Sequence, residues 1–579
     1  MPDAPAMAAP ALQAMDLTSL RAVLSELRPA LLPSRFEKAQ QPDPHSLHLG
    51  FRTMERRLWL ELGWLAEAPR LMAIAAPPRL GSGSTLAQQL QHGLAGLALT
   101  ELVQEGWERV VELRFATRPG DPIQRTLVLE LMGRHSNLFL LDPERRVVAM
   151  ARQVRQNQSR LRPIGTGDFY CAPPALSGSP PSLAESFAHW KGQLTLLPVN
   201  LKQALQGAYQ GISPALALQL TGDSTLLKTP VGELSSEDWE RLWSRWQQWL
   251  RCLEGEHFCF EQGQGTAYCC WIQEPARQPS SVGGDLPING ALAAYLQGSL
   301  ATRQLQQRQQ NLRHKLEQAI EREQRQKAQQ QQLLDQVEGS AALQEQADAL
   351  LCLPDPSREQ ITEAQKLYKK ARKLRRSVAA ISPRIEQHRQ QIRQLEESLL
   401  FLDLDDGGSR PPGEQLDQLQ QLEEDCEVLL RRQTLSRRER RSAETPQPLT
   451  LQTPGGLTVQ VGRNHRQNDW ISLQQGRKGD LWFHAQECPG SHVVLKSSAA
   501  QPDEQDLQSA ADLAAFFSRA RGNRRVAVVM APCEALQRIA GAGPGTVRHR
   551  GGEVLWADPE QAKTLLNPAA PNLNWAVES

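Results

Sequence analysis

Along the first 180 positions, apolar and polar residues alternate with two periodicities, that of helices and that of strands. Residues 17–32 carry apolar side chains at helical spacing before Pro33, which predicts a helix that ends there. Residues 85–97 predict a second helix. Alternating or continuous apolar runs predict strands over 57–64, 70–75, 108–116, 125–132 and 137–141. This mixture indicates an α+β domain, which ends near residue 180 where Pro and Ser become frequent.

A helical segment follows that domain. It runs through 200–205 and 211–220, where Gly-Ile-Ser-Pro supplies a turn, a hydroxyl N-cap and a Pro at the first helical position. A helix N-terminus of this kind can hold a phosphate, but a well-capped helix without a ligand explains the same residues. Residues 258–271 form a weaker, strand-like patch.

Residues 292–402 become rich in Gln, Arg, Glu and Leu, and their second half repeats apolar residues every seven positions. One polar residue, His388, interrupts the repeat, whose apolar members are Leu374, Val378, Ile381, Ile385, Ile392, Leu395, Leu399 and Leu402. Heptads of this length predict a coiled coil. Leu-Pro-Asp-Pro-Ser at 353–357 breaks the helix, so we predict two antiparallel helices, the longer roughly 80–90 Å at about 1.5 Å per residue. Pro383 predicts a kink in the second helix.

The last part of the chain reads as a second α+β domain. A linker over 403–445 holds an acidic helix and an Arg-rich run. The pattern beyond it predicts strands at 457–461 and 525–530, a helix at 510–521 and a hairpin at 546–556 that turns on two glycines.

Residues 480–495 of this domain carry the most informative motif. Two apolar strands meet at Pro489-Gly490, a turn that gathers His484, His492 and neighbouring aromatic rings into a small area. Rings that stack on bases and groups that hydrogen-bond phosphates are the chemistry of RNA recognition. His484, Cys488 and His492 have a spacing seen among zinc ligands, but the Pro-Gly pair breaks the helix that this spacing needs, so we predict no metal site.

Charge is balanced overall but segregated locally. The 579 residues carry a net charge of +1, and a chain of this length needs several domains. Residues 366–376 hold seven basic and no acidic side chains, close to the predicted end of the helical pair. A solvated helix face explains such a run, but a polyanionic surface also relieves its self-repulsion and gains affinity through counterion release.

Cysteine usage and hydropathy favour a cytoplasmic protein. The nine cysteines form no Cys-x-x-Cys pair, which suits reduced thiols. Residues 1–14 lack the basic and apolar regions of a signal peptide and predict a flexible leader. The sequence has no run of about 18 apolar residues, so we predict no membrane span.

Two motifs resemble those of a known family. Asp-x-Trp-Phe-His at 480–484 with Pro-Gly-Ser-His-Val-Val at 489–494 resembles the signature of the NFACT RNA-binding domain. Glu-Leu-Met-Gly-Arg-His-Ser-Asn at 130–137 with 138–142 resembles the NFACT N-terminal domain, also called the fibronectin-binding protein A N-terminal domain. Both occur in this order, around a coiled coil, in the RqcH and NEMF ribosome-quality-control proteins.

The resemblance implies an α+β multidomain fold with a helical middle. After the leader we expect an NFACT N-terminal domain over 15–180, a helix-hairpin-helix region over 181–285, an antiparallel coiled-coil arm with its linker over 286–445, and an NFACT RNA-binding domain over 446–579. Family arms carry an inserted segment between their two helices, whereas the connection here is short.

The resemblance also implies which residues contact RNA. In the family an Asp-Arg pair recognises tRNA; here it is Glu108-Arg109, whose longer acidic stem moves the carboxylate by about one bond. From the residues alone, that pair suits a solvated strand end, and 133–137 suits either a hairpin turn or a functional edge. The expected tRNA-binding residues are Glu108, Arg109, Arg134, His135 and Asn137. The expected RNA contacts of the last domain are Arg463, Asn464, Asp480, Trp482, Phe483, His484, Gly490, Ser491 and His492, and the ribosome-binding residues of the arm are Lys366, Lys369, Lys370, Arg372, Lys373, Arg375 and Arg376.

The function implied is binding rather than catalysis. A protein of this family would bind an obstructed large ribosomal subunit with its peptidyl-tRNA and recruit alanyl-tRNA, so that the ribosome adds a C-terminal tail to the stalled chain. The partners would be ribosomal RNA and tRNA, with no cofactor, metal or membrane. A serine-hydrolase motif is absent, and Gly-Ser-Gly-Ser-Thr at 81–85 lacks the Lys of a phosphate loop. Two rivals are a DNA glycosylase-like repair protein, which could use Pro2, and a fibronectin-binding surface adhesin, which would need export.

Overall fold

The computed structural model describes residues 12–79, 83–156, 162–263, 266–272, 286–354, 356–404, 411–431, 446–539 and 543–566. They fall into two compact units, Met1–Leu300 (the N-terminal unit) and Ala301–Ser579 (the C-terminal unit). None of the helices in these ranges combines the length and apolar character needed to cross a bilayer. Pro2 and most of the Arg-rich run after residue 431 lie outside the described residues.

The described strands of the N-terminal unit form one antiparallel sheet in the order β4-β3-β2-β1-β5-β6-β7-β8-β9. Five of these strands match the sequence prediction closely, whereas β1, β2, β5 and β9 are additions to it. The strands are β1 (Ser34–Asp43), β2 (Ser46–Arg52), β3 (Arg57–Leu65), β4 (Ala68–Ile74), β5 (Ala98–Val103), β6 (Val110–Ala116), β7 (Arg125–Glu130), β8 (Asn137–Leu141) and β9 (Val147–Met150).

Two helices complete the core of this sheet. Helix α1 (Leu17–Leu31) begins at Asp16, whose carboxylate accepts from Ser19 N at 2.9 Å in a capping box, and its apolar side enters the core. Helix α2 (Thr85–Gly93) contacts β1 and β9 and ends four residues earlier than residue 97, the predicted end. The opposite face near β7 and β8 carries a smaller apolar cluster around Val128, Phe139 and Ile164.

The next segment is helical, as predicted. It contains α3 (Phe187–Leu194), α4 (Leu201–Ala208), α5 (Pro214–Thr221) and α6 (Ser236–Gly255), with short 3-10 turns at Leu226–Lys228 and Val231–Glu233. Packed tryptophans fill its interior, and the indole N–H of Trp249 donates to Thr18 Oγ1 at 3.0 Å, which ties α6 to α1. Within the described part of 258–271, the predicted strand-like patch is a short antiparallel pairing: Glu261 and Cys269 form a bridge, and Cys259 N donates to Cys270 O at 3.1 Å.

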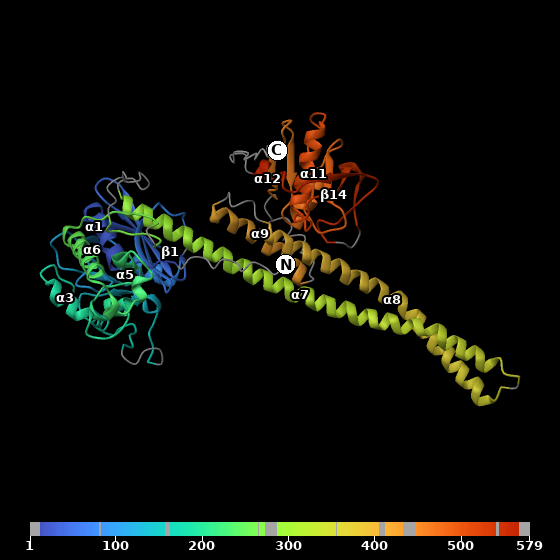
Figure 1. Cartoon of the computed structure of the whole chain (residues 1–579), viewed down its shortest axis with the longest axis horizontal. Coiled ribbons are helices and arrows are strands. Elements are labelled where there is room, and N and C mark those ends of the chain that lie inside the picture. Colours follow the sequence, from blue (N-terminus) through green and yellow to red (C-terminus); the bar gives the residue numbers. More distant parts are fainter. Residues whose placement is uncertain are drawn as a thin grey trace. The chain divides into compact units, whose positions relative to one another are not determined.

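Two long helices follow, α7 (Pro287–Leu351) and α8 (Arg358–Asp403), separated by the predicted breaker. Helix α7 begins in the N-terminal unit, where Glu26 accepts from Ile288 N and Asn289 N at 2.9 Å each. Figure 1 shows the two helices side by side, and contacts between residues 348 and 368 and between 313 and 403 give an antiparallel register. Helix α9 (Pro412–Arg431), the predicted acidic helix, packs against α8.

The chain ends in a second antiparallel sheet, which we call the C-terminal sheet domain (residues 446–566). Helix α11 (Glu504–Phe516) covers one face, with Phe483 and Leu513 in the core between them. The strand order is β10-β11-β13-β12-β14-β17. These strands are β10 (Leu449–Gln452), β11 (Thr458–Val461), β12 (Leu481–Ala485), β13 (Val493–Leu495), β14 (Val526–Pro532) and β17 (Glu553–Ala557).

The other face of this sheet is partly covered by a short helical turn and a small separate sheet. The turn consists of α10 (His465–Asp469) and the π-helix η5 (Trp470–Gln474), and a 3-10 turn, η6 (Cys533–Ala535), precedes the small sheet of β15 (Leu536–Arg538) and β16 (Val547–His549). The hairpin predicted at 546–556 is therefore wrong, because β16 pairs with β15 while β17 pairs with β14. A short helix, α12 (Ala562–Leu566), packs against α11.

The root of the helical pair packs against this domain through buried polar groups. His465 of α10 contacts Ser398 Oγ of α8 at 3.0 Å through Nε2, and its ring lies edge-on to Phe401 at a centroid distance of 5.2 Å. Asp425 of α9 accepts from Arg466 N at 3.4 Å. Helices α8 and α9 and the sheet domain are thereby joined within the C-terminal unit.

Candidate nucleic-acid interface

A cavity of about 860 Å³ lies in the N-terminal unit, and the residues expected to bind tRNA share it. It has apolar walls with charged side chains among them, which suits a ligand that is both planar and polar. Its lining includes Glu108, Arg109, Arg134, His135 and Asn137, the apolar Trp107, Met132, Phe139, Ile164, Leu176 and Ile212, and Asp16, Arg152, Ser213 and Pro214.

Strand pairing explains why two of these groups meet. Val110 at the start of β6 is opposite Glu130 at the end of β7, so the residues just outside both strands share one end of the sheet. Leu131 N donates to Arg109 O at 2.9 Å there. The turn that follows, η1 (Gly133–His135), uses a positive φ of 57° at Gly133, so the predicted link between two apolar strands is confirmed.

Glu108 and Arg109 point to different partners. Glu108 Oε1 accepts from Leu176 N at 3.0 Å, and the Arg109 guanidinium donates to Met15 O at 3.3 Å. Burial raises the pKa of Glu108 above its usual value, while its backbone hydrogen bond and the charge of Arg109 act in the opposite direction. Both side chains therefore have a fixed direction at the cavity without forming a closed ion pair with each other.

Arg134 and His135 are exposed, and Arg134 Nε donates to His135 Nε2 at 3.0 Å. Asn137 differs from them, because it is 1 % exposed and its side chain is used locally. Its Oδ1 accepts from Leu138 N at 2.9 Å and from Arg152 N at 3.0 Å, and its amide donates to Arg152 O at 2.7 Å. Asn137 thus fixes the position of the turn, whereas the side chains of Arg134 and His135 are exposed at the cavity.

Two helix N-termini meet at the cavity, and one of their caps was missed from the sequence. Ser213 caps α5 as expected, accepting from Leu216 N at 2.9 Å. Its hydroxyl also donates to Asp16 Oδ2 at 2.7 Å, so the carboxylate that caps α1 holds the cap of α5 as well. The spacing of Asp16 and Ser19 ahead of an apolar helix is a capping signal that would have identified Asp16.

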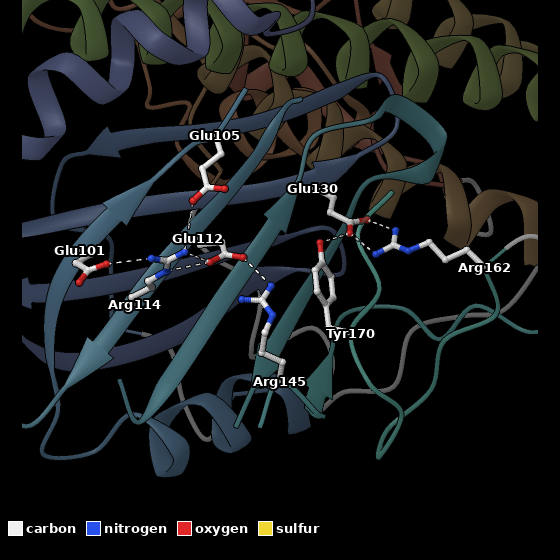
Figure 2. A network of polar contacts seen from close by, with 8 residues as sticks. All are labelled: Glu101, Glu105, Glu112, Arg114, Glu130, Arg145, Arg162 and Tyr170. Atoms are coloured by element: carbon white, nitrogen blue, oxygen red, sulfur yellow. Dashed lines mark hydrogen bonds and ion pairs between the residues drawn. The ribbon is translucent and has the colours of Figure 1, made fainter. Parts of the chain in front are cut away.

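A buried ion pair forms part of the cavity wall (Figure 2). Arg162 donates to the two oxygens of Glu130 at 2.9 and 2.5 Å, and the Tyr170 hydroxyl donates to the same carboxylate at 2.8 Å. Burial raises the pKa of Tyr170, so this hydroxyl stays a donor. Arg162 and Glu130 neutralise each other. The remaining charged groups of the lining are the guanidinium groups of Arg109, Arg134 and Arg152 and the carboxylates of Asp16 and Glu108.

Figure 2 also shows a second network on neighbouring strands. Arg114 pairs with Glu101 at 3.1 Å and Glu112 at 2.8 Å, and Arg145 pairs with Glu112 at 2.7 Å. Burial opposes the charged form of Glu112, but hydrogen bonds from Arg145 and Arg114 outweigh it and lower its pKa. This network has no part in the cavity lining and we assign it to sheet stability.

The motif of the C-terminal sheet domain forms the ring cluster that the sequence predicted. Strands β12 and β13 pair on either side of the Pro-Gly turn. The rings of Trp482 and His484 stack at 5.6 Å with an interplanar angle of 4°, and His492 meets each of them edge-on at 5.2 and 5.4 Å. Burial lowers the pKa of His484 to about 4, so the ring is neutral at pH 7.

Burial corrects the role expected of several of these residues. Trp482 is 3 % exposed, Phe483 is fully buried in the core against α11, and His492 is 4 % exposed with Nδ1 at 2.8 Å from Ser472 Oγ. Ser491 is also fully buried, and a Cβ on Gly490 would lie 3.1 Å from Ser518 Cβ. Of the motif residues expected to contact RNA, only His484 is partly exposed, because both faces of the sheet are covered near β12 and β13.

The three remaining expected contacts are also structural. Asp480 is 0 % exposed and accepts from Arg477 N at 3.0 Å, Ser498 N at 3.1 Å and Lys496 Nζ at 3.3 Å. Arg463 is 8 % exposed and donates to Gln418 Oε1 of α9 at 2.8 Å. Asn464 caps α10 by accepting from Gln467 N at 2.8 Å. These side chains hold the domain together and do not face a ligand.

The basic residues expected on the arm lie in the first part of α8, and each is exposed. Ala364 and Ala371 of the same helix are buried, so the small residues face α7 while the charges face solvent. Lys366 pairs with Glu363 at 3.2 Å, and Arg375 donates to Gln344. Among the described residues, no acidic side chain pairs with Lys369, Lys370, Arg372 or Lys373.

The described residues contain no group of three His, Cys, Asp or Glu side chains arranged to hold a metal ion.

Comparison with known proteins gives two family matches. The family of NFACT N-terminal and middle domains matches residues 16–359 and 354–447, and the NFACT protein RNA binding domain matches residues 449–551. Curated proteins named "Rqc2 homolog RqcH" align along most of the chain. The protein of Streptococcus suis is 25% identical over 94% of this chain and 98% of its own length, and that of Bacillus subtilis is 23% identical over 92% and 96%.

Solved structures give partial matches. The C-terminal part of the fibronectin/fibrinogen-binding protein of Streptococcus suis is 28% identical with a TM-score of 0.37, covering 45% of this chain and 98% of that one. The N-terminal part of the same protein is 22% identical with a TM-score of 0.38, covering 49% of this chain and 99% of that one.

Proposed function

We propose, since this chain belongs to the NFACT family, that it is a cytoplasmic quality-control factor that binds RNA on the ribosome. The curated relatives that carry the name "Rqc2 homolog RqcH" align over nearly their whole length, which supports this role. The RNA partner follows from the match to the RNA binding domain. Binding and orientation are its contribution, and peptide transfer belongs to the ribosome.

The observation that carries the proposal is the convergence of Glu108, Arg109, Arg134 and His135 on one cavity. Arginine forks hydrogen-bond phosphates or purine edges, and the Glu108 carboxylate accepts amino protons. The apolar walls suit the face of an unpaired base, which is how proteins read single-stranded parts of folded RNA. We therefore assign tRNA to this cavity, with α4 and α5 as the helix-hairpin-helix region that holds its backbone.

The helical pair α7–α8 acts in this proposal as a coiled-coil arm along the large ribosomal subunit. The exposed lysines and arginines in the first part of α8 suit ribosomal RNA, since neutralised phosphates release counterions. The complete cycle that we propose is the binding of an obstructed large subunit with its peptidyl-tRNA, the recruitment of alanyl-tRNA and the template-free extension of the stalled chain.

Sequencing the RNA that remains bound to the full chain tests this function. The protein is crosslinked in cells, purified under denaturing conditions and digested, and the attached RNA is identified. Large-subunit ribosomal RNA together with one or a few tRNA species is the expected result. Recovery of neither, or of messenger RNA alone, contradicts the proposal, and the share of alanine tRNA decides the choice of tRNA.

A further inference from the structure

The edge strand β17 exposes two large apolar side chains in a domain that otherwise buries them. Val554 is 49% exposed and Trp556 is 59% exposed. Leu555, between them in the sequence, packs on the core beneath α11. Because successive side chains of a strand point to opposite faces, Val554 and Trp556 share the face that is turned away from α11.

Register places these side chains beside the ring cluster of the RNA-binding motif. Val554 is opposite Val529, and Val529 is opposite His484, so the three lie in one row across adjacent strands about 4.8 Å apart. Trp556 is opposite Ala527 in the next row. His549 of β16 lies 5.9 Å from the Trp482 ring and is itself exposed. We call His484, Val529, His549, Val554 and Trp556 the ring strip.

Positive charge lies close to this strip. Arg548 and Arg550 flank His549 in the sequence, and Arg525 directly precedes β14; all three are exposed. In the part of the chain that the structure describes, none of the three forms an ion pair. Arg525 therefore lies near Trp556, and Arg548 and Arg550 lie near His549 at the other end of the strip. Unpaired cations at both ends of an exposed aromatic strip complement the phosphates of an RNA strand, whereas an apolar protein partner would leave these charges without a partner.

The backbone edge of β17 is partly closed to another strand. Gln508 Nε2 of α11 donates to Trp556 O at 3.0 Å, and Asp512 Oδ1 accepts from Asp558 N at 2.8 Å. Side chains of α11 therefore occupy polar groups that strand addition would need. The Trp556 side chain itself stays 59% exposed, which favours a ligand that stacks on the indole over one that adds a strand.

We propose that the ring strip is a binding site for single-stranded RNA, with one base stacked on Trp556 and phosphates near Arg548 and Arg550. The proposal deepens the RNA-binding function proposed above and rests on it for the class of ligand. It moves the contact from the buried motif residues to a strand that begins two residues after the matched RNA-binding region ends at residue 551. Duplex RNA does not offer its base faces to such a ring, so the site selects unpaired nucleotides.

Anisotropy of a labelled 12-nucleotide oligouridine, titrated with the full chain, tests the site. Stacking on an aromatic ring contributes about 1–3 kcal/mol per base, so Trp556→Ala should weaken binding about tenfold. Trp556→Phe keeps a ring and should retain most of the affinity. Phe169→Ala is the matched control, because Phe169 is also 59% exposed but lies in the other unit, and its affinity should be unchanged.

The charge is tested in the same assay. Arg548→Glu with Arg550→Glu should weaken binding and make it less dependent on salt, because two phosphate contacts are lost. Arg109→Ala, measured alongside, reports any oligouridine that enters the cavity of the N-terminal unit. A second copy of the chain could bind to β17 instead of RNA. Sedimentation velocity of wild type and Trp556→Ala detects such a dimer.

Three results overturn the proposal: no binding of oligouridine by wild type, equal affinity of Trp556→Ala and wild type, or a dimer that Trp556→Ala dissolves. Co-sedimentation with large ribosomal subunits distinguishes a failure of the ring strip from a failure of the proposed ribosomal function. If Trp556→Ala binds oligouridine as wild type does yet both co-sediment, the strip is wrong and the ribosomal function stands. If wild type binds oligouridine through Trp556 but no ribosomes, the strip stands and the ribosomal function is wrong.

Discussion

His388 of α8 and Glu323 of α7 lie 2.7 Å apart, from Nδ1 to Oε2, in the interface of the two long helices. The Glu323 side chain is 1% exposed and that of His388 is 15% exposed. The one polar interruption of the heptad repeat in α8 is thus matched by an acidic residue of α7 that the sequence pattern did not single out.

Because this pair is buried, we expect its two members to depend on each other. His388→Leu leaves a buried carboxylate without its ring partner and should destabilise the helical pair by about 2 kcal/mol, whereas the double variant with Glu323→Leu should recover much of the loss. Hydrogen exchange of α7 and α8 amides measures this locally. Glu321→Gln is the control, since its pair with Arg325 is exposed and should matter by less than about 0.5 kcal/mol. Equal amide exchange rates in His388→Leu and in the control Glu321→Gln would contradict the expectation.

Charge reversal at Lys369, Lys370, Arg372 and Lys373 should reduce co-sedimentation with large ribosomal subunits. The wild-type interaction should fall steeply with salt, and the variant should show a lower salt dependence because phosphate contacts are lost. Sucrose-gradient fractions at two salt concentrations measure both. A variant with the same change in net charge at exposed positions of the N-terminal unit is the control: Arg118→Glu, Lys228→Glu, Arg241→Glu and Arg251→Glu. Unchanged sedimentation of the arm variant would refute the assignment.

Arg109→Ala should lower the amount of tRNA recovered with the protein about tenfold while leaving subunit binding intact. The guanidinium lines the cavity and its removal costs a charged hydrogen-bond donor, worth about 1.5–3 kcal/mol. Quantitative sequencing of crosslinked tRNA measures the change. Arg118→Ala, an exposed residue between β6 and β7, is the control. Equal recovery from both variants means that the cavity does not hold tRNA.

Asp480→Asn should act through folding rather than RNA contact. The carboxylate is buried and accepts two backbone N–H groups and Lys496 Nζ, so we expect a loss of about 2–3 kcal/mol in the stability of the sheet domain. Urea unfolding of the full chain, followed by Trp fluorescence, reports the loss. Under conditions where the variant is folded, oligouridine affinity should equal that of wild type, and a large drop there would restore Asp480 as a contact.

The joint of α8 with the sheet domain should weaken as pH rises from about 6.5 to 8.5. Burial raises the pKa of Glu397 to about 8 and lowers that of His465 to about 4, and His465 Nδ1 lies 3.5 Å from Glu397 Oε2. His465 Nε2 donates to Gln394 O at 3.1 Å, so in the neutral ring Nδ1 carries no proton and faces the Glu397 carboxyl.

The sign of this effect follows from proton binding. Glu397 keeps its proton in the folded state up to about pH 8, whereas an unfolded Glu loses it near pH 4.3, so its proton binding makes the folded state lose stability as pH rises between these values. The lowered pKa of His465 acts in the opposite direction below about pH 6.5, so the loss from Glu397 stands alone above that pH. Hydrogen exchange in α8 at several pH values, corrected for intrinsic exchange, measures it. Glu397→Gln should flatten the dependence, and a parallel slope in wild type and variant would rule out this residue.

The sequence predicts much of the fold where local pattern decides the structure. The heptads and the breaker at 353–357 define α7 and α8, because a helical seam needs neighbours only a few residues away. Strand β1 escaped prediction, since Ser34–Asp43 shows little alternation and owes its order to pairing with β2 and β5 on its two sides. Long-range pairing of this kind leaves no local signal.

The candidate site, like the fold, could be predicted only where local sequence patterns determine the structure. Glu108 and the turn at 133–137 share one sheet end, which follows from the pairing of consecutive predicted strands. Asp16 and Ser213 reach the cavity through packing between segments that are distant in the sequence, so their presence in its wall could not be inferred from the sequence. Trp482 and Phe483 lie on opposite faces of β12, and only the structure shows that both faces are covered there.

Asp16 serves two helices with one carboxylate, and this sharing makes the wall of the cavity cooperative. Its Oδ1 accepts from Ser19 N in α1 while Oδ2 accepts from the hydroxyl that caps α5. A ligand that pulled the start of α5 toward itself would also loosen the first turn of α1. Movement of the helical segment at this corner is therefore coupled to the first helix of the sheet domain through a single side chain.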